Sequence, residues 1–115
     1  MASILVVDDD PSILRLVSVL LKAEGHEVTT TMHGVDALDI LEERDPDLLI
    51  LDLNIPDVGG ESVCRRARFA GYVHPVVVLS AMETGYDVSR EMKADAYLPK
   101  PFHPDVLSDY VASLT

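Results

Sequence analysis

The sequence predicts a single α/β domain in which a five-stranded parallel sheet is doubly wound by five helices. Short apolar runs without polar alternation, such as residues 48–51 and 76–79, are typical of strands buried on both faces. Segments with apolar residues at helical spacing separate these runs. Five such alternations predict parallel strands joined by right-handed crossovers. The length of 115 residues, 48% of them hydrophobic, suffices for one core.

The first half of the chain contains two strand–helix units. Residues 3–7 form the first predicted strand, and Pro11 is a favourable first residue for the helix that follows. That helix ends at Gly25, where a left-handed cap is expected. The β-branched residues 27–31 predict the second strand. The expected inward-facing residues of the first helix and of the second, residues 35–43, are Ile13, Leu14, Val17, Leu20, Leu21, Val35, Leu38 and Leu41.

The second half repeats this pattern three times. The third strand, residues 48–51, ends at Asp52, and the turn-rich residues 55–60 lead into a helix over about residues 61–70. The fourth strand, residues 75–79, ends at Ser80. The remaining expected elements are a weaker helix over about residues 84–92, a strand at 96–98 and a last helix at 105–114, with Val106, Leu107, Tyr110 and Val111 inward.

Composition excludes several classes of function. The net charge of −11 argues against a nucleic-acid-binding surface, because phosphate contacts depend on Lys and Arg. No apolar run approaches the length of a membrane span, and no signal peptide is visible. A single cysteine, Cys64, cannot form an intramolecular disulfide. We therefore expect a cytoplasmic protein, with one domain over residues 1–115 and no output domain encoded.

Polar side chains gather at the predicted carboxyl edge of the sheet, where ligands bind in open α/β folds. The strand ends bring together Asp8, Asp9, Asp52 and Ser80, and the loop after the fifth strand adds Lys100. Adjacent carboxylates repel one another unless a cation is present, and Mg²⁺ prefers carboxylates, waters and phosphate oxygens. This combination favours a phosphoryl-binding site in which a carboxylate is a competent covalent acceptor.

Four motifs, each at a predicted strand end, resemble those of response-regulator receiver domains of two-component signalling. They are the residues Ile-Leu-Val-Val-Asp-Asp-Asp at 4–10, Asp-Leu-Leu-Ile-Leu-Asp-Leu-Asn-Ile-Pro at 47–56, Val-Leu-Ser-Ala at 78–81, and Tyr-Leu-Pro-Lys-Pro-Phe at 97–102. The resemblance covers essentially the whole chain. It implies the flavodoxin-like strand order 2-1-3-4-5.

The resemblance also assigns roles to individual residues. It implies that Asp52 accepts a phosphoryl group from the phosphohistidine of a sensor histidine kinase or phosphotransfer protein. Mg²⁺ (or Mn²⁺) would be held by Asp9, Asp52 and the backbone carbonyl of Asn54, with Asp8 acting through water. Lys100 would pair with the carboxylate and later with the phosphoryl oxygens.

Four further residues match the switching part of the family pattern. Ser80 would donate its hydroxyl to a phosphoryl oxygen, and Ala81 would keep the neighbouring space open. Tyr97 matches the aromatic residue that turns inward, and Pro101 a position where the preceding peptide bond is typically cis. A downstream protein would then bind the face formed by residues 84–92, 96–98 and 105–114, and the domain would act as a monomer or a phosphorylation-linked dimer.

The sequence departs from the family pattern at three places. Gly59 replaces the usual Asp, a change expected to matter little because Gly60 is retained. Lys93 replaces a glycine, which costs energy if the backbone there needs a positive φ. The spacing from Ser80 to Lys100 is slightly short, so we expect a short or mobile helix over residues 84–92.

Other interpretations remain open at this stage. Asp8 to Asp10 could simply cap a helix, since acids are favoured at helix amino termini. A receiver-like docking module that does not use phosphorylation is one alternative function. A Mg²⁺-dependent phospho-aspartate hydrolase is another, but that class needs a second carboxylate two residues after the nucleophile, where this chain has Asn54. A flavodoxin-like nucleotide binder would need a phosphate loop after the first strand, which is absent.

Overall fold

The computed structural model describes residues 1–115, along which five strands alternate with five helices. In chain order the elements are β1 (Ser3–Val7), α1 (Pro11–Ala23), β2 (Glu27–Thr31), α2 (Gly34–Arg44), β3 (Leu48–Asp52), α3 (Gly60–Phe69), β4 (Val76–Ser80), α4 (Gly85–Glu91), β5 (Ala96–Pro99) and α5 (Pro104–Leu114). All neighbouring strands are parallel, in the order β2-β1-β3-β4-β5. The predicted fold class and strand order are confirmed.

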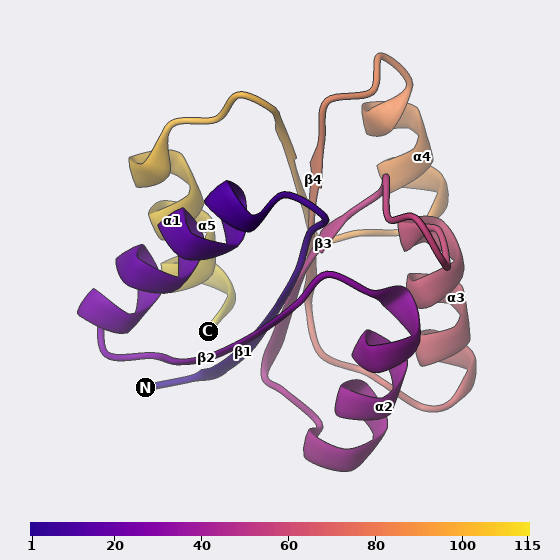
Figure 1. The fold of residues 1–115 in the computed structure, drawn as a ribbon, viewed down its shortest axis with the longest axis horizontal. Coiled ribbons are helices and arrows are strands. Elements are labelled where there is room, and N and C mark those ends of the chain that lie inside the picture. Colours follow the sequence, from indigo (N-terminus) through magenta and orange to yellow (C-terminus); the bar gives the residue numbers. More distant parts are fainter.

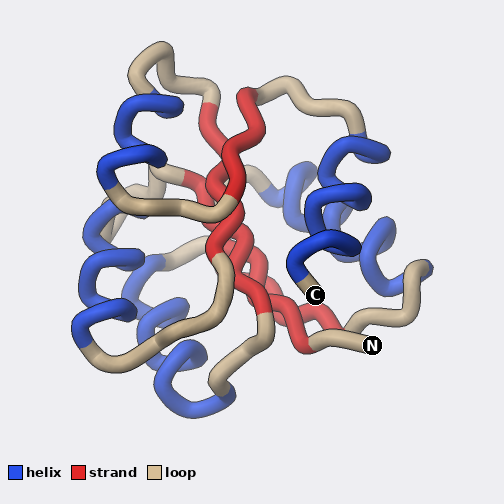
Figure 2. Tube along the Cα trace, turned by 180° about the vertical axis from the view of Figure 1, so that it is seen from behind, coloured by secondary structure: helices blue, strands red, loops and turns tan.

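The sheet lies between two layers of helices. α1 and α5 cover one face, and α2, α3 and α4 cover the other (Figure 1). Seen from behind, the strands run between these two layers (Figure 2). Each face has its own apolar core, one built from strand residues with α2 and α3 and one from strand residues with α1 and α5. No helix is both long and apolar enough to cross a membrane.

The position of each strand in the sheet follows from its sequence. Every residue of β3 and of β4 is buried, as expected for central parallel strands covered on both faces. β2 lies at one edge, where its Glu and Thr side chains are only partly covered. In the register, Val7 pairs with Leu51, Asp52 with Leu79, and Ser80 with Pro99, so the carboxyl ends of four strands meet at one edge.

The helices bury the predicted stripes with two exceptions. Val35 and Val106, both expected to face inward, are 53% and 45% exposed. Each lies in the first turn of its helix but on the exposed side of that turn, next to a buried residue, Gly34 in α2 and Leu107 in α5. In α2 the stripe consists instead of Gly34, Ala37 and Leu41. The expectation for Val35 and Val106 was therefore wrong, because periodicity alone does not fix where a stripe begins.

Backbone conformation accounts for the helix ends and for one departure from the family pattern. Gly25 and Gly71, which follow α1 and α3, have φ values of 91° and 102°, as expected for glycines just beyond helix ends. Lys93 has φ 59°, so this lysine does occupy a position that favours glycine. It follows α4, which has only seven residues and is as short as its sequence predicted.

Candidate functional site

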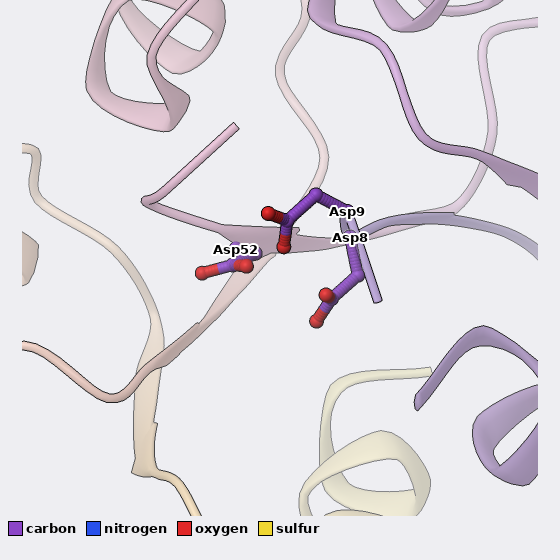
Figure 3. Close-up of side chains that lie close together, drawn as sticks. All are labelled: Asp8, Asp9 and Asp52. Carbon is purple, nitrogen blue, oxygen red and sulfur yellow. The ribbon is translucent and has the colours of Figure 1, made fainter. Parts of the chain in front are cut away.

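Three aspartates lie together at the carboxyl edge of the sheet. Asp8 and Asp9 directly follow β1, and Asp52 is the last residue of β3. One carboxylate oxygen from each lies within 4.8 Å of the others, and Figure 3 shows the three side chains beside one another. Asp8 and Asp52 are buried, whereas Asp9 is exposed. The register of β1 and β3 therefore creates a partly open acidic cluster.

Asp10, the third acid of residues 8–10, caps a helix and does not belong to the acidic cluster. Asp10 is the N-cap of α1, and its Oδ1 accepts a hydrogen bond of 2.8 Å from the Ser12 N–H. Asp8 Oδ1 accepts another of 2.9 Å from the Asp10 N–H. Helix capping thus accounts for Asp10 but leaves the Asp9 side chain and one oxygen of Asp8 free to face Asp52.

Lys100 provides the cation of this site. Its Nζ donates to Asp8 Oδ2 at 2.7 Å and to Asp52 Oδ2 at 3.1 Å. Its backbone N–H donates to the Ser80 carbonyl at 2.8 Å, which fixes the loop after β5 to the end of β4. The following Lys100–Pro101 peptide bond is cis, as the resemblance implied. The ammonium group therefore bridges Asp8 and Asp52, with the shorter bond to Asp8.

Burial and charge shift the pKa values of this pair. Burial raises the pKa of Asp52; the Asn54 N–H, at 3.1 Å from Asp52 Oδ1, lowers it, and the charge of Asp8 raises it further. Burial lowers the pKa of Lys100, but its hydrogen bond to Asp8 and the charges of Asp8 and Asp52 outweigh burial and raise it overall. A protonated lysine is thus strongly favoured, while ionised Asp52 gains from any additional cation.

The donor set fits a hard divalent cation. Three carboxylates face one ammonium group, so negative charge remains in excess within a radius of a few ångströms. Oxygen ligands with an exposed side toward solvent are what Mg²⁺ prefers, because it keeps several of its waters. The exposed Asp9 supplies that open side. Asn54 is also exposed, and the role of its backbone carbonyl as a ligand stays a prediction.

The remaining predicted residues lie on β4 and β5 or directly after β4. Ser80 is buried at the end of β4, where its Oγ accepts a hydrogen bond of 3.0 Å from the Met82 N–H. Ala81 follows it and is exposed. Tyr97 in β5 is half-buried and packs edge-on against Tyr86, with ring centroids 5.8 Å apart. These residues flank the acidic cluster on the side of α4.

One supporting residue was not anticipated from the sequence. Asp57, in the loop after β3, accepts hydrogen bonds from the N–H groups of Gly34 at 2.8 Å and Val35 at 3.1 Å, at the start of α2. These bonds, that of Gly34 first, lower the pKa of Asp57 to about 2. Asp57 thereby ties the loop that carries Asn54 to a helix 23 positions earlier in the chain. No local sequence pattern signals a cap supplied from so far away.

Gly60 is required by space at the same loop. A Cβ atom there would collide with the backbone oxygen of Asp52, and the Gly60 N–H donates to the Leu53 carbonyl at 3.0 Å. Gly59 has nothing within 4 Å of a Cβ, so this position is free of steric demand. These contacts explain why glycine is retained at residue 60, and the expectation that Gly59 in place of Asp matters little stays a prediction.

Comparisons with known proteins agree on one family. The sequence profile of the response regulator receiver domain matches residues 4–112. The chain is 42% identical over 106 residues to the DNA-binding response regulator MtrA of Mycolicibacterium smegmatis, covering 90% of this chain and 46% of that protein. It spans less than half the length of the curated relatives it matches.

Solved structures agree with the sequence matches. The receiver domain of the Francisella response regulator 1452 superposes with a TM-score of 0.92 at 28% identity, over 99% of this chain and 96% of that one. The BeF3-activated receiver domain of DrrB superposes with a TM-score of 0.89 at 32% identity, over 99% of this chain and 97% of that one.

Proposed function

This chain belongs to the response regulator receiver family, and on that premise we propose that it is the phosphoacceptor domain of a two-component phosphorelay. Asp52 takes a phosphoryl group from the phosphohistidine of a sensor histidine kinase or of a phosphotransfer protein. The observation that supports this most is the arrangement of Asp52 Oδ2, which lies 3.1 Å from Lys100 Nζ inside a cluster of two further acids.

The proposed transfer is a simple displacement at phosphorus. A carboxylate oxygen of Asp52 forms the new P–O bond while the P–N bond to the donor imidazole breaks, and the imidazole leaves with its electron pair and takes up a proton. The Lys100 ammonium group can follow the oxygens without leaving the site, because the backbone N–H of Lys100 is held at the Ser80 carbonyl. The acceptor is consumed once per phosphoryl group, so the domain is not a classical enzyme.

The residues around Asp52 prepare it for this step. Mg²⁺ (or Mn²⁺), held by Asp9 and Asp52 with Asp8 and the Asn54 carbonyl in support, would supply charge neutralisation for the approaching phosphoryl oxygens. The Asn54 N–H orients Asp52 through Oδ1 and leaves the other oxygen toward Lys100. Because Asp52 is buried, bulk water is kept away from most of its side chain.

Phosphorylation of Asp52 would then change the conformation of a protein-interaction surface. The phosphoryl group adds about 1.5 to 2 negative charges and three strong acceptors. The Ser80 hydroxyl, which now accepts from Met82, would turn to donate to one of them. The loop before α4 moves with it, and Tyr97 and the face formed by α4, β5 and α5 change for a downstream partner in the cytoplasm.

The deciding experiment is modification by a small phosphodonor. The protein is incubated with acetyl phosphate and Mg²⁺, or with beryllofluoride and Mg²⁺, and analysed by mass spectrometry and by NMR. One phosphoryl group per chain on Asp52 is expected, with loss of the modification in Asp52→Asn. Asp39→Asn, an exposed aspartate on α2, is the matched control and should be modified normally.

Two results would contradict the proposal. One is the absence of any Asp52-dependent mass or spectral change in the folded protein, which would favour a docking module that does not use phosphorylation. The other is steady turnover of small phosphate esters in place of a stoichiometric acyl phosphate, which would favour a hydrolase. Paramagnetic broadening by Mn²⁺ gives an independent readout, since amide signals near Asp9 and Asp52 should disappear first.

A further inference from the structure

Gly85, the first residue of α4, is buried directly above two side chains of the proposed switch. A Cβ atom on Gly85 would lie 2.8 Å from Ser80 Oγ, 2.8 Å from the Tyr97 hydroxyl oxygen and 2.9 Å from Ser80 Cβ. Its φ is outside the left-handed region, so glycine is needed here for space and not for backbone conformation. The first turn of α4 therefore rests on Ser80 and Tyr97 without an intervening side chain.

Beside this contact, Tyr97, Tyr86 and Arg90 pack in sequence toward the surface of α4. Tyr86 follows Gly85, is 52% exposed, and packs edge-on against Tyr97. The Arg90 guanidinium lies 5.8 Å from the centroid of the Tyr86 ring. The Tyr86 carbonyl accepts a hydrogen bond of 2.7 Å from the buried Ser89 hydroxyl, which holds this turn in place. A displacement of Tyr97 would therefore change the packing of Tyr86, which is exposed.

The two contacts of Gly85 differ in how easily they can move. Ser80 Cβ belongs to the last residue of a central, fully buried strand, whereas the Tyr97 hydroxyl is the far end of a flexible, half-buried side chain. Side chains added to tightly packed sites are accommodated by the neighbour that yields at least cost. A methyl group at residue 85 would therefore displace the Tyr97 ring outward, and its contacts of 2.8 and 2.9 Å with Ser80 Oγ and Cβ would shift the first turn of α4 away from β4.

We propose that Gly85 is a positioning residue that makes the inner position of Tyr97 available and couples Ser80 and Tyr97 to the surface residues Tyr86 and Arg90. This inference rests on the proposed function, since it concerns how a signal at Asp52 is passed on. It assigns no role to Gly85 in the transfer itself. Residue 85 would thus decide whether a modified domain can signal, and not whether it can be modified.

The test is Gly85→Ala compared with Gly59→Ala, a matched glycine at another helix start where a Cβ meets nothing within 4 Å. Beryllofluoride and Mg²⁺ are added, and Asp52 modification is followed together with the ring signals of the tyrosines, of which the chain has four. In the parent and in Gly59→Ala, the Tyr97 and Tyr86 signals should shift together. In Gly85→Ala, Asp52 should still react while both ring shifts are lost.

A second variant separates positioning from general damage to the fold. Gly85→Ala combined with Tyr97→Phe lacks the hydroxyl that the new methyl group meets, so the Tyr86 shift should return at least in part. The double variant should also recover thermal stability relative to Gly85→Ala, and it replaces the single variant if that one does not fold.

Each remaining outcome contradicts either the positioning role of Gly85 or the proposed function of the domain. Coupled ring shifts in Gly85→Ala equal to those of the parent would overturn the positioning role, as would a double variant with no recovery of either shift or stability. A parent protein that is not modified at Asp52 would instead contradict the proposed function and leave no signal to transmit. The two failures are distinguished by the parent protein alone.

Discussion

Replacement of Lys100 by methionine tests the charge balance on which the proposed function depends. The ammonium group is the only cation that contacts the buried Asp8 and Asp52 carboxylates, at 2.7 and 3.1 Å. With an effective dielectric constant of about 20, these two attractions amount to about 6 and about 5 kcal/mol. Desolvation of the lysine offsets part of this, and breaking a buried ion pair typically costs about 3–5 kcal/mol.

The cost should depend on pH in a defined direction. A raised pKa of Asp52 means that its contribution to stability is full below its ordinary value of 3.8 and declines as pH rises through the higher folded value. Without Lys100 the folded pKa of Asp52 rises further, so the decline still begins near 3.8 but continues to higher pH and is deeper. We therefore expect Lys100→Met to be nearly neutral at pH 4 and most destabilising above neutral pH.

Urea unfolding at several pH values measures the effect. With a slope of about 1.5 kcal/mol/M, the midpoint of Lys100→Met should fall by about 2–3 M at pH 7. Mg²⁺ should restore more stability to the variant than to the parent, because a ligand that binds only the folded state stabilises it. Lys22→Met, an exposed lysine on α1, is the control and should change stability little. A loss at pH 7 no larger than that of the control would refute the reasoning.

Three further predictions follow from single contacts. Lys93→Gly removes the strain of φ 59° and should raise the free energy of unfolding by about 1 kcal/mol in thermal melts, whereas Lys93→Ala should not. Asp57→Asn should lower stability above pH 4 but not at pH 2, because the lowered pKa of about 2 means that its contribution is present above 3.8 and lost as pH falls toward 2; pH-dependent melts would show the curves converging. Tyr72→Phe should cost about 1–3 kcal/mol in urea unfolding, since the hydroxyl donates to the buried Pro46 carbonyl at 2.9 Å, and Tyr110→Phe serves as its control.

The sequence pattern predicted the strands and the edge at which polar residues meet, and the resemblance to receiver domains implied the strand order. Buried parallel strands are continuous apolar runs, and the first polar residue after such a run marks the point where the chain leaves the sheet. Asp52 and Ser80 could be located in this way because the signal lies within five or six neighbouring residues. Lys100 was identified by the same local logic, from its position after the last strand.

Local patterns were less successful where side chains have to be oriented. Val35 and Val106 fit a helical stripe by spacing, yet both point to solvent in the first turn of their helices. Spacing gives the period of a stripe but not its phase, and the phase is set by how the helix docks on the sheet.

The sequence by itself therefore determined the set of chemical groups at the carboxyl edge, because the end of a strand can be recognised from a few neighbouring residues. What only the tertiary structure decided is how those groups divide their tasks. Asp10 caps a helix while Asp8 meets Lys100 from 92 positions away, and Gly85 leaves room for Tyr97 over Ser80. The physical reason is that burial, charge pairing and steric exclusion act through space. They join residues that are far apart along the chain, and no local sequence pattern predicts such contacts.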